Sequence, residues 1–285
     1  MAIEKFRFDS EQPGKNILIF GAIHGDEHCG PVAIRSVIEK IEQGTWPLLK
    51  GSVTFVPICN PKAHEEKKRV RKENLNRIFK KTSVPETEEQ ELANELTTLV
   101  DMCDVLLDIH SSFVPAPTNV FVDYPTEENL AFATALAPEF LIFDWPKTYA
   151  ENPSFDSWTT DRYAHEAGKI GILTECGQHD APSSIEHAER YMQRTLAHFG
   201  NIAPLNEAAP ELARRVYMTG MWKRESAEDR FARAWHHLEF VPRGALIALR
   251  SDGEEILASE DCFIIFPKDY ALPGGEWFYV SVERE

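Results

Sequence analysis

Residues 16–41, NILIFGAIHGDEHCGPVAIRSVIEKI, contain the pattern of one strand, one polar turn and one helix. Residues 16–20 form a short apolar run that ends at Gly21, and this run predicts a buried strand. Residues 31–41 carry apolar side chains three and four positions apart, which is the spacing of an amphipathic helix. A strand that passes through a turn into a helix indicates a layered α/β fold.

The same alternation of strands and helices continues to about residue 200. Further strands are predicted at 53–58, 105–109 and 170–174, and further helices at 86–100 and 183–199. Alternation of this kind favours a sheet whose strands are largely parallel or mixed in direction. We therefore predict an α/β domain that spans residues 1–204.

The pattern changes in the segment NIAPLNEAAPELA, residues 201–213, where two prolines and many small residues predict a linker. Short β-like runs follow it, at 215–218, 237–241, 245–250, 255–258, 262–266 and 277–282. Asp252-Gly253 between two of these runs is typical of a hairpin turn. These features predict a small β-rich C-terminal domain over residues 205–285.

The composition argues against several classes of protein. Of 285 residues, 43% are hydrophobic, and Lys and Arg number 30 against 46 Asp and Glu, a net charge of −16. Nucleic acids and anionic membranes bind basic surfaces, so neither partner is expected. No apolar run could span a membrane, and the N-terminus lacks the apolar core of a signal peptide. The five cysteines are scattered without C-x-x-C spacing, so we expect reduced, buried thiols in a cytoplasmic protein.

The turn at residues 21–30 is rich in groups that bind metals or move protons. Its His24-x-x-Glu27-His28 spacing matches the zinc motif H-x-x-E-H, in which both histidines are ligands and the glutamate is the base. That motif needs a continuous helix, and three glycines in the turn argue against one. We favour the shorter H-x-x-E, with His24 and Glu27 as ligands and His28 pointing elsewhere. A polar loop in which Asp26 and Glu27 merely begin a helix explains this stretch about equally well.

Two later segments end apolar strands in polar side chains. In LLDIHSS, residues 106–112, Asp108 and His110 share one face of a strand, so His110 could be a third ligand and Asp108 could orient an imidazole. In GILTECGQHD, residues 171–180, a strand ends in Glu175, a natural general base beside a metal. Ordinary strand-end acids and a hydrogen-bonded core histidine remain the alternatives. Two histidines and one glutamate would leave a fourth position for water, as in catalytic zinc sites.

Residues 62–81 carry a net positive charge, although the chain as a whole is negative. They hold nine Lys or Arg and three Glu, a local charge of +6. Such a run is commonly a solvated basic face, and the alternative is a funnel for an anionic substrate. In the second case Arg69 and Arg77 could clamp carboxylates and Asn76 could add amide donors.

The order of these motifs resembles that of the aspartoacylase/succinylglutamate desuccinylase family, a branch of the zinc carboxypeptidase-like hydrolases. The matching motifs are H-x-x-E at 24–27, N-P-x-A at 60–63, Arg69 followed by N-L-N-R at 74–77, D-I-H at 108–110 and E-x-G at 175–177. The resemblance implies a three-layer α/β/α domain with a mixed, mostly parallel sheet, to which a β-rich C-terminal domain is appended.

The resemblance also implies the metal chemistry of the site. One Zn²⁺ per chain would be held by His24, Glu27 and His110. Asp108 would support a ligand from the second shell, and Glu175 would activate the attacking water. His28 would take no part.

Residues that bind the substrate follow from the same resemblance. Arg69 would polarise the scissile carbonyl, and Asn76 and Arg77 would grip the α-carboxylate. In aspartoacylases an arginine ten residues before the catalytic glutamate binds the substrate's side-chain carboxylate. Here that position is His165, and Arg162 nearby is the candidate for substrate binding, so N-acetylaspartate is not the expected substrate.

The activity that this resemblance implies is zinc-dependent hydrolysis of the amide bond in a small, anionic N-acyl amino acid. A metallocarboxypeptidase that cleaves short peptides is the first alternative, and a non-catalytic member of the fold is the second. The appended β domain favours deacylation because it would narrow the cleft to small substrates. The oligomeric state is not indicated by the sequence.

Overall fold

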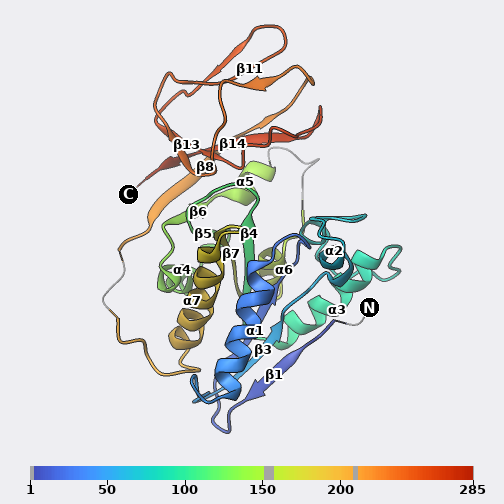
Figure 1. The fold of residues 1–285 in the computed structure, drawn as a ribbon, viewed down its shortest axis with the longest axis vertical. Coiled ribbons are helices and arrows are strands. Elements are labelled where there is room, and N and C mark those ends of the chain that lie inside the picture. Colours follow the sequence, from blue (N-terminus) through green and yellow to red (C-terminus); the bar gives the residue numbers. More distant parts are fainter. Residues whose placement is uncertain (1–2, 151–156, 208–210, 285) are drawn as a thin grey trace.

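A long mixed sheet runs through the structure, a computed structural model that describes residues 3–150, 157–207 and 211–284 (Figure 1). Its N-terminal strands are β1 (Phe6–Asp9), β2 (Asn16–Gly21), β3 (Ser52–Val56), β4 (Val105–Ser112), β5 (Asn119–Val122), β6 (Phe140–Phe143) and β7 (Ile170–Gln178). Strands β3, β2, β4 and β7 are parallel neighbours in that order, whereas β1 and β5 run antiparallel to β3 and β7. The predicted mixed, mostly parallel sheet of this region is confirmed.

Helices cover both faces of the sheet and make three layers (Figure 1). The longer ones are α1 (Cys29–Glu42), α3 (Glu88–Met102), α4 (Glu127–Leu136) and α7 (Pro182–His198), and the shorter ones are α2 (Pro61–Glu65), α5 (Trp145–Ala150), α6 (Thr160–Glu166) and the 3₁₀ turn η1 (Leu75–Arg77). Helices α1, α4 and α7 lie on one face, and α3 and α6 on the other. Among the described residues, no helix is both long and apolar enough to cross a membrane.

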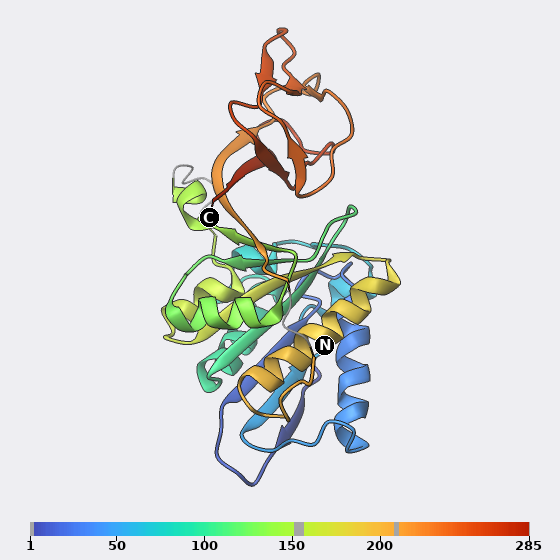
Figure 2. The same cartoon turned by 90° about the vertical axis from the view of Figure 1, so that its left-hand side faces the viewer.

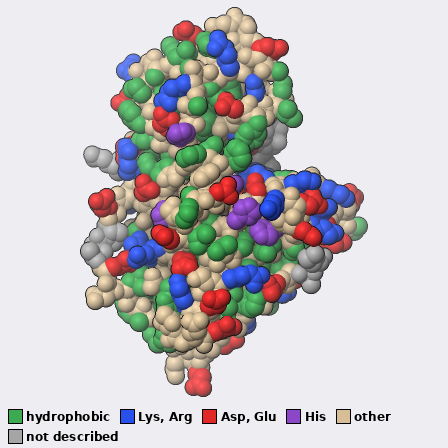
Figure 3. Space-filling view, in the orientation of Figure 1, with side chains coloured by type: hydrophobic (Ala, Val, Ile, Leu, Met, Phe, Trp, Pro, Cys, Tyr) green, Lys and Arg blue, Asp and Glu red, His purple; other side chains and the backbone are tan. Residues whose placement is uncertain are grey.

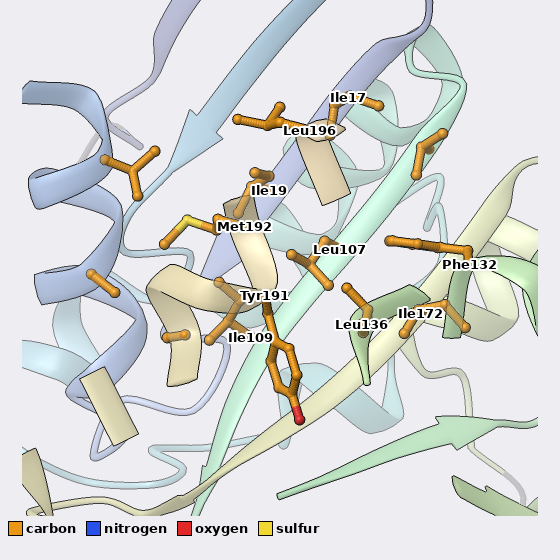
Figure 4. Packing of buried hydrophobic residues seen from close by; sticks show 14 of the residues in the cluster. Ile17, Ile19, Leu107, Ile109, Phe132, Leu136, Ile172, Tyr191, Met192 and Leu196 are labelled. Carbon is orange, nitrogen blue, oxygen red and sulfur yellow. The ribbon is translucent and has the colours of Figure 1, made fainter. Parts of the chain in front are cut away.

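The apolar run that opens β2 supplies both cores, because successive side chains of a strand point to opposite faces. Ile17 and Ile19 pack with α1 and α7, whereas Leu18 and Phe20 pack with α3. Figure 4 shows the first of these cores, where side chains of α7 such as Met192 lie over the strand residues. Burial of each such side chain stabilises the fold by roughly 1.5–3 kcal/mol. The five cysteines are likewise buried, as predicted.

Strands β4 and β7 extend beyond their predicted ends, and this difference matters for the site. They pair in parallel from Val105 opposite Ile170 to His110 opposite Glu175, and after a register shift Ser112 lies opposite Gln178. Pairing continues because each strand supplies the hydrogen-bond partners of the other after the apolar run has ended. The D-I-H and E-C-G segments therefore lie within strands, where neighbouring backbones hold them in register.

The segment between β4 and α6 contains elements that the sequence did not predict. Strands β5 and β6 are only four residues long, and β5 runs antiparallel to β7. Helix α4 begins at Thr126, whose side chain accepts a hydrogen bond from the Asn129 backbone N–H. Strands this short show too little alternation to be recognised from their own residues.

The C-terminal region is rich in β structure, as predicted. It comprises β8 (Arg214–Lys223), β9 (Arg230–Phe231), β10 (Glu239–Val241), β11 (Leu246–Leu249), β12 (Glu255–Leu257), β13 (Cys262–Ile265) and β14 (Glu276–Glu283). Strands β11 and β12 form the predicted hairpin, in which Gly253 adopts a φ of +93°. Figure 2 shows this region standing above the helices and the main sheet.

The main sheet crosses the predicted boundary between the two parts. Strand β8 pairs in parallel with β6, and β14, β13 and β10 extend the same sheet. The division into residues 1–204 and 205–285 therefore stays a prediction. Residues 208–210 of the predicted linker lie outside the described residues.

Candidate metal centre

The turn between β2 and α1 carries the first two predicted ligands. Helix α1 begins at Cys29, so the H-x-x-E-H motif precedes the helix and does not lie within it. Ala22 has a φ of +47°, which bends the chain directly after the strand. Gly25 is required by close packing, because a Cβ atom there would lie 2.2 Å from the carbonyl carbon of Ala63. The ring of His28 lies 5.6 Å from that of His64, and His28 is not part of the ligand group.

His24, Glu27 and His110 converge in the interior although His110 comes from a different strand. The Nδ1 atoms of His24 and His110 lie 2.7 and 2.9 Å from the two carboxylate oxygens of Glu27, and 3.2 Å from each other. All three side chains are buried. Two imidazoles and a carboxylate are common zinc ligands, and ligands of a tetrahedral zinc ion lie roughly 3.3 Å apart. The donor set and its spacing therefore fit one zinc ion.

A second ring of side chains orients the two imidazoles. The Nε2 atom of His24 lies 3.1 Å from Asn74 Oδ1, and that of His110 lies 2.9 Å from Asp108 Oδ2. These oxygens can only accept, so a proton on each Nε2 would be bound there and would leave each Nδ1 lone pair for a metal ion. Asp108 occupies the supporting position expected of it. Asn74 was not assigned a role, because sequence spacing does not show which amide reaches an imidazole.

The charges of the ligand group attract a cation to its centre. Burial raises the pKa of Glu27, but the two histidines outweigh burial and hold this pKa well below its usual value. Burial lowers the pKa of His110, but the charges of Asp108 and Glu27 raise it well above its usual value. The carboxylate therefore stays ionised, and positive charge beside it is strongly favoured.

Glu175 lies directly beside the ligand group. It is the cross-strand neighbour of His110 in the β4–β7 pair, and both side chains line the same cavity. Burial, and then the charge of Glu27, raise the pKa of Glu175 to about 8. Its Oε2 atom has no hydrogen-bond partner among the described residues. A carboxyl group with these properties can exchange a proton near neutral pH.

Arg69, Asn76 and Arg77 reach the same cavity from one loop. Arg69 donates from Nη1 to Glu27 Oε1 at 2.9 Å, and its side chain is 45% exposed. Arg77 donates to the Asn76 carbonyl at 2.9 Å and to the Tyr149 hydroxyl at 3.3 Å. The structure thus brings the three predicted substrate-binding residues of this loop to one wall.

The other cations of the basic segment 62–81 serve a different purpose. Lys62 and Arg71 pair with Glu88 at 2.9 and 3.0 Å, and Lys81 pairs with Asp101 at 2.5 Å. These ion pairs make most of the segment a solvated face.

The C-terminal region closes the cavity. Its side chains there are Phe266, Pro267, Lys268, Tyr270, Glu276 and Tyr279. The cavity is partly open to solvent, and its volume of about 280 Å³ is close to the lower limit for ligand pockets. Figure 3 shows charged and histidine side chains on the surface where the two parts meet.

A family model described as the succinylglutamate desuccinylase/aspartoacylase catalytic domain matches residues 13–200, which include every predicted ligand and Glu175. The chain belongs to this family. The N-alpha-acetyl-L-2,4-diaminobutyric acid deacetylase of Halomonas elongata is 27% identical over 198 residues, which are 66% of this chain and 55% of that protein. The match thus spans about half the length of that relative.

Solved structures of similar fold cover nearly the whole chain. A succinylglutamate desuccinylase/aspartoacylase from Rhodobacter sphaeroides has a TM-score of 0.76 at 18% identity and covers 96% of this chain and 87% of its own. The ectoine utilization protein EutE (DoeB) from Ruegeria pomeroyi has a TM-score of 0.77 at 21% identity and covers 99% and 88%. At these identities the likeness establishes the fold, including its β-rich C-terminal region.

In this family member Arg162 lines a neighbouring cavity, which shares Asp123, Trp145 and Thr159 with the cavity beside the ligand group. Arg162 donates to the Ser157 carbonyl at 2.7 Å, its guanidinium lies 4.5 Å from the Trp158 ring centre, and it does not line the cavity beside the ligand group. His165 stacks on Tyr124 at 4.1 Å. The role assigned to Arg162 stays a prediction without support from this placement.

Several cavity residues were not predicted from the sequence, and two of them are the aspartates Asp123 and Asp161. Asp123 and Asp161 line the cavity although neither belongs to a recognised motif. Asp161 lies one residue before Arg162, so proximity to the predicted specificity segment was the only available signal.

Proposed function

We propose that this protein is a zinc-dependent amidohydrolase that releases a free amino acid from a small N-acyl amino acid. One observation carries the proposal: His24, Glu27 and His110 form a group that could hold a metal ion, and His24, His110 and Glu175 line one small cavity. The family, and a relative named for removing an acetyl group from an amino acid, support the same chemistry.

The metal in this proposal is one Zn²⁺ per chain. His24, Glu27 and His110 would hold it, with Asn74 and Asp108 fixing the two imidazoles. Bound zinc supplies positive charge that polarises a carbonyl and lowers the pKa of water from 15.7 towards about 7.

The chain's own residues move the proton and stabilise charge. Glu175 takes the proton of the attacking water and later gives it to the leaving amine, which a pKa near neutrality permits. Arg69 donates to the oxyanion that develops on the acyl carbonyl, more strongly than to the neutral carbonyl. Asn76 and Arg77 hold the α-carboxylate and so place the amide beside Glu175.

Enclosure by the C-terminal region favours a deacylase over a carboxypeptidase. A cavity of about 280 Å³ admits a small N-acyl amino acid but leaves little room for a peptide. The zinc chemistry would be the same in both enzymes, so size and not chemistry separates them.

The experiment is a panel of N-acetyl and N-succinyl amino acids, with a tripeptide for comparison. Protein stripped with a chelator and protein reloaded with zinc are both assayed for release of the amine. We expect release from N-acyl amino acids only after zinc is added. Cleavage of the tripeptide alone would indicate a carboxypeptidase. Absence of zinc from the freshly purified protein, together with inactivity after loading, would indicate a non-catalytic member.

A further inference from the structure

Asp123 lies at the end of the cavity away from the ligand group. Strands β5 and β7 pair antiparallel, with Asn119 opposite Glu175 and Phe121 opposite Leu173. Asp123 follows Phe121 by two residues, so it shares that face of the sheet and lies still further from Glu175. The distance along β7 from Glu175 to this point, four residues, is about 13 Å.

Asp161 reaches the same place from helix α6. A Cβ atom on Gly171, which is the β7 residue at this end, would lie 3.5 Å from the Asp161 Cα. Asp161 and Asp123 both line the cavity, and the charge of Asp161 helps to raise the pKa of Asp123. Two segments 38 residues apart in the sequence thus place two acids together in one cavity wall.

Both carboxyl groups keep an oxygen without a partner. Asp161 is only 3% exposed, and the Oδ1 atoms of Asp161 and Asp123 accept no hydrogen bond from the residues that the structure describes. A buried polar atom in this state is costly, so a structural role alone does not account for the pair.

Asp229 in the C-terminal region is a buried aspartate with a structural role, and it serves as a comparison. It is 1% exposed, and its oxygens accept from the backbone N–H groups of Glu225 and Ser251, at 2.9 Å each, and from Arg250 at 3.0 Å. Both oxygens of that carboxylate have hydrogen-bond partners. By contrast, one oxygen of Asp123 and one of Asp161 have no partner among the described residues.

The cations that line the cavity contact groups other than the two aspartates, although the charge of Arg77 lowers the pKa of Asp123. Arg69 contacts Glu27 at 2.9 Å, Lys268 pairs with Glu276 at 2.5 Å, and Arg77 donates to Tyr149 and to a carbonyl. No ion pair to either aspartate is present within the described ranges of the chain. Burial raises the pKa of both carboxyl groups, and the charge of Asp161 adds to the rise at Asp123. A pair of this kind shares one proton and keeps one negative charge.

We propose that Asp123 and Asp161 bind the cationic side chain of the substrate, which makes the substrate an N-acyl derivative of a basic amino acid. The inference rests on the proposed function, because it assigns the binding of the substrate side chain to the end of the cavity opposite the scissile bond. A single ammonium or guanidinium group would supply the donors that both Oδ1 atoms lack and would match the charge of the pair. The substrate then carries a negative α-carboxylate for Arg77 and a positive side chain for the aspartates.

The test compares side chains of similar size and different charge. The kcat/KM values of the zinc-loaded protein are measured for Nα-acetyl derivatives of 2,4-diaminobutyrate, ornithine and lysine, and for those of norleucine, glutamine and glutamate. We expect at least one basic substrate to exceed the neutral ones by roughly 10- to 100-fold, a typical effect of a buried charge pair. Asp161→Asn and Asp123→Asn should each reduce this ratio at least about tenfold. Asp252→Asn in the exposed β11–β12 turn is the matched control.

A binding measurement separates this inference from the proposed function. Calorimetry with the Glu175→Gln protein compares free lysine and diaminobutyrate with norleucine, so no turnover is needed. Tighter binding of a basic amino acid that is lost in the Asp161→Asn or the Asp123→Asn background supports the cation site. Equal binding of basic and neutral amino acids, or faster hydrolysis of neutral or anionic substrates, would overturn it while leaving the hydrolase intact. Hydrolysis of no compound in the panel would overturn the proposed function instead.

Discussion

The two ends of the cavity differ in how their polar atoms are satisfied. At the ligand end, Asn74 and Asp108 hold the Nε2 atoms of the histidines, and Glu27 contacts both rings and Arg69. At the other end, Asp123 and Asp161 line the cavity, and one oxygen of each has no hydrogen-bond partner among the described residues. The ligand end is organised by the chain itself and could hold a metal ion, whereas the far end keeps unpartnered oxygens that the proposed cation would satisfy. We thus assign the reaction to the ligand end and the selection of the substrate side chain to the other end.

Glu175→Gln should produce the largest effect, because it removes the proton carrier of the ligand end. A positioned acid–base group contributes typically about 10²–10⁴ in rate, and we expect amine release to fall by that factor. Zinc content, measured on the same preparation, should be unchanged because Glu175 is not a ligand. If zinc were lost together with activity, Glu175 would be a metal ligand and not the proton carrier.

Arg69→Ala should follow, with a fall in kcat of roughly 10²–10³, which is typical for loss of one oxyanion donor. Because Arg69 also contacts Glu27 at 2.9 Å, zinc content must be determined beside the kinetics. The matched control is Arg71→Ala from the same segment, since Arg71 pairs with Glu66 and Glu88 outside the cavity. Unchanged kcat in Arg69→Ala would remove this arginine from the chemistry.

Asp108→Asn should weaken the hold on zinc without displacing a ligand. Loss of an acidic partner behind a metal-binding histidine typically costs about 10–100-fold in metal affinity. Titration against a competing chelator measures the change, and the matched variant at the other histidine is Asn74→Ala. Unaltered zinc affinity with reduced turnover would show that Asp108 acts on the reaction and not on the metal.

The ligand end could be predicted from the sequence because its signals are local. His24 and Glu27 are three positions apart in one turn. Asp108 and His110 lie on one face of a strand, and Glu175 ends an apolar run. Strand register then brings these pieces together, since Asp108 faces Leu173 and His110 faces Glu175. Short periodic patterns carry such information well.

The far end could not be predicted, because it depends on long-range pairing. Asp123 reaches the cavity only because the four-residue strand β5 runs antiparallel to β7. Asp161 reaches it only because helix α6 packs where β7 has a glycine, Gly171. Neither the direction of a short strand nor the contact of a helix with a distant glycine is encoded in local periodicity. The resemblance implies a small anionic substrate, whereas the proposed cation site adds a basic side chain to that expectation.

His28→Ala should have the smallest effect, and it tests whether His28 is a metal ligand. His28 lies at the N-cap of α1 beside His64, outside the ligand group, so zinc content and kcat should stay within about twofold of the unsubstituted protein. Metal analysis and the amine-release assay on one preparation measure both. Loss of zinc in His28→Ala would restore the H-x-x-E-H interpretation, with His28 as a ligand and Glu27 as the base. Proton transfer would then move from Glu175 into the turn, and the pKa of Glu175 near 8 would need another explanation.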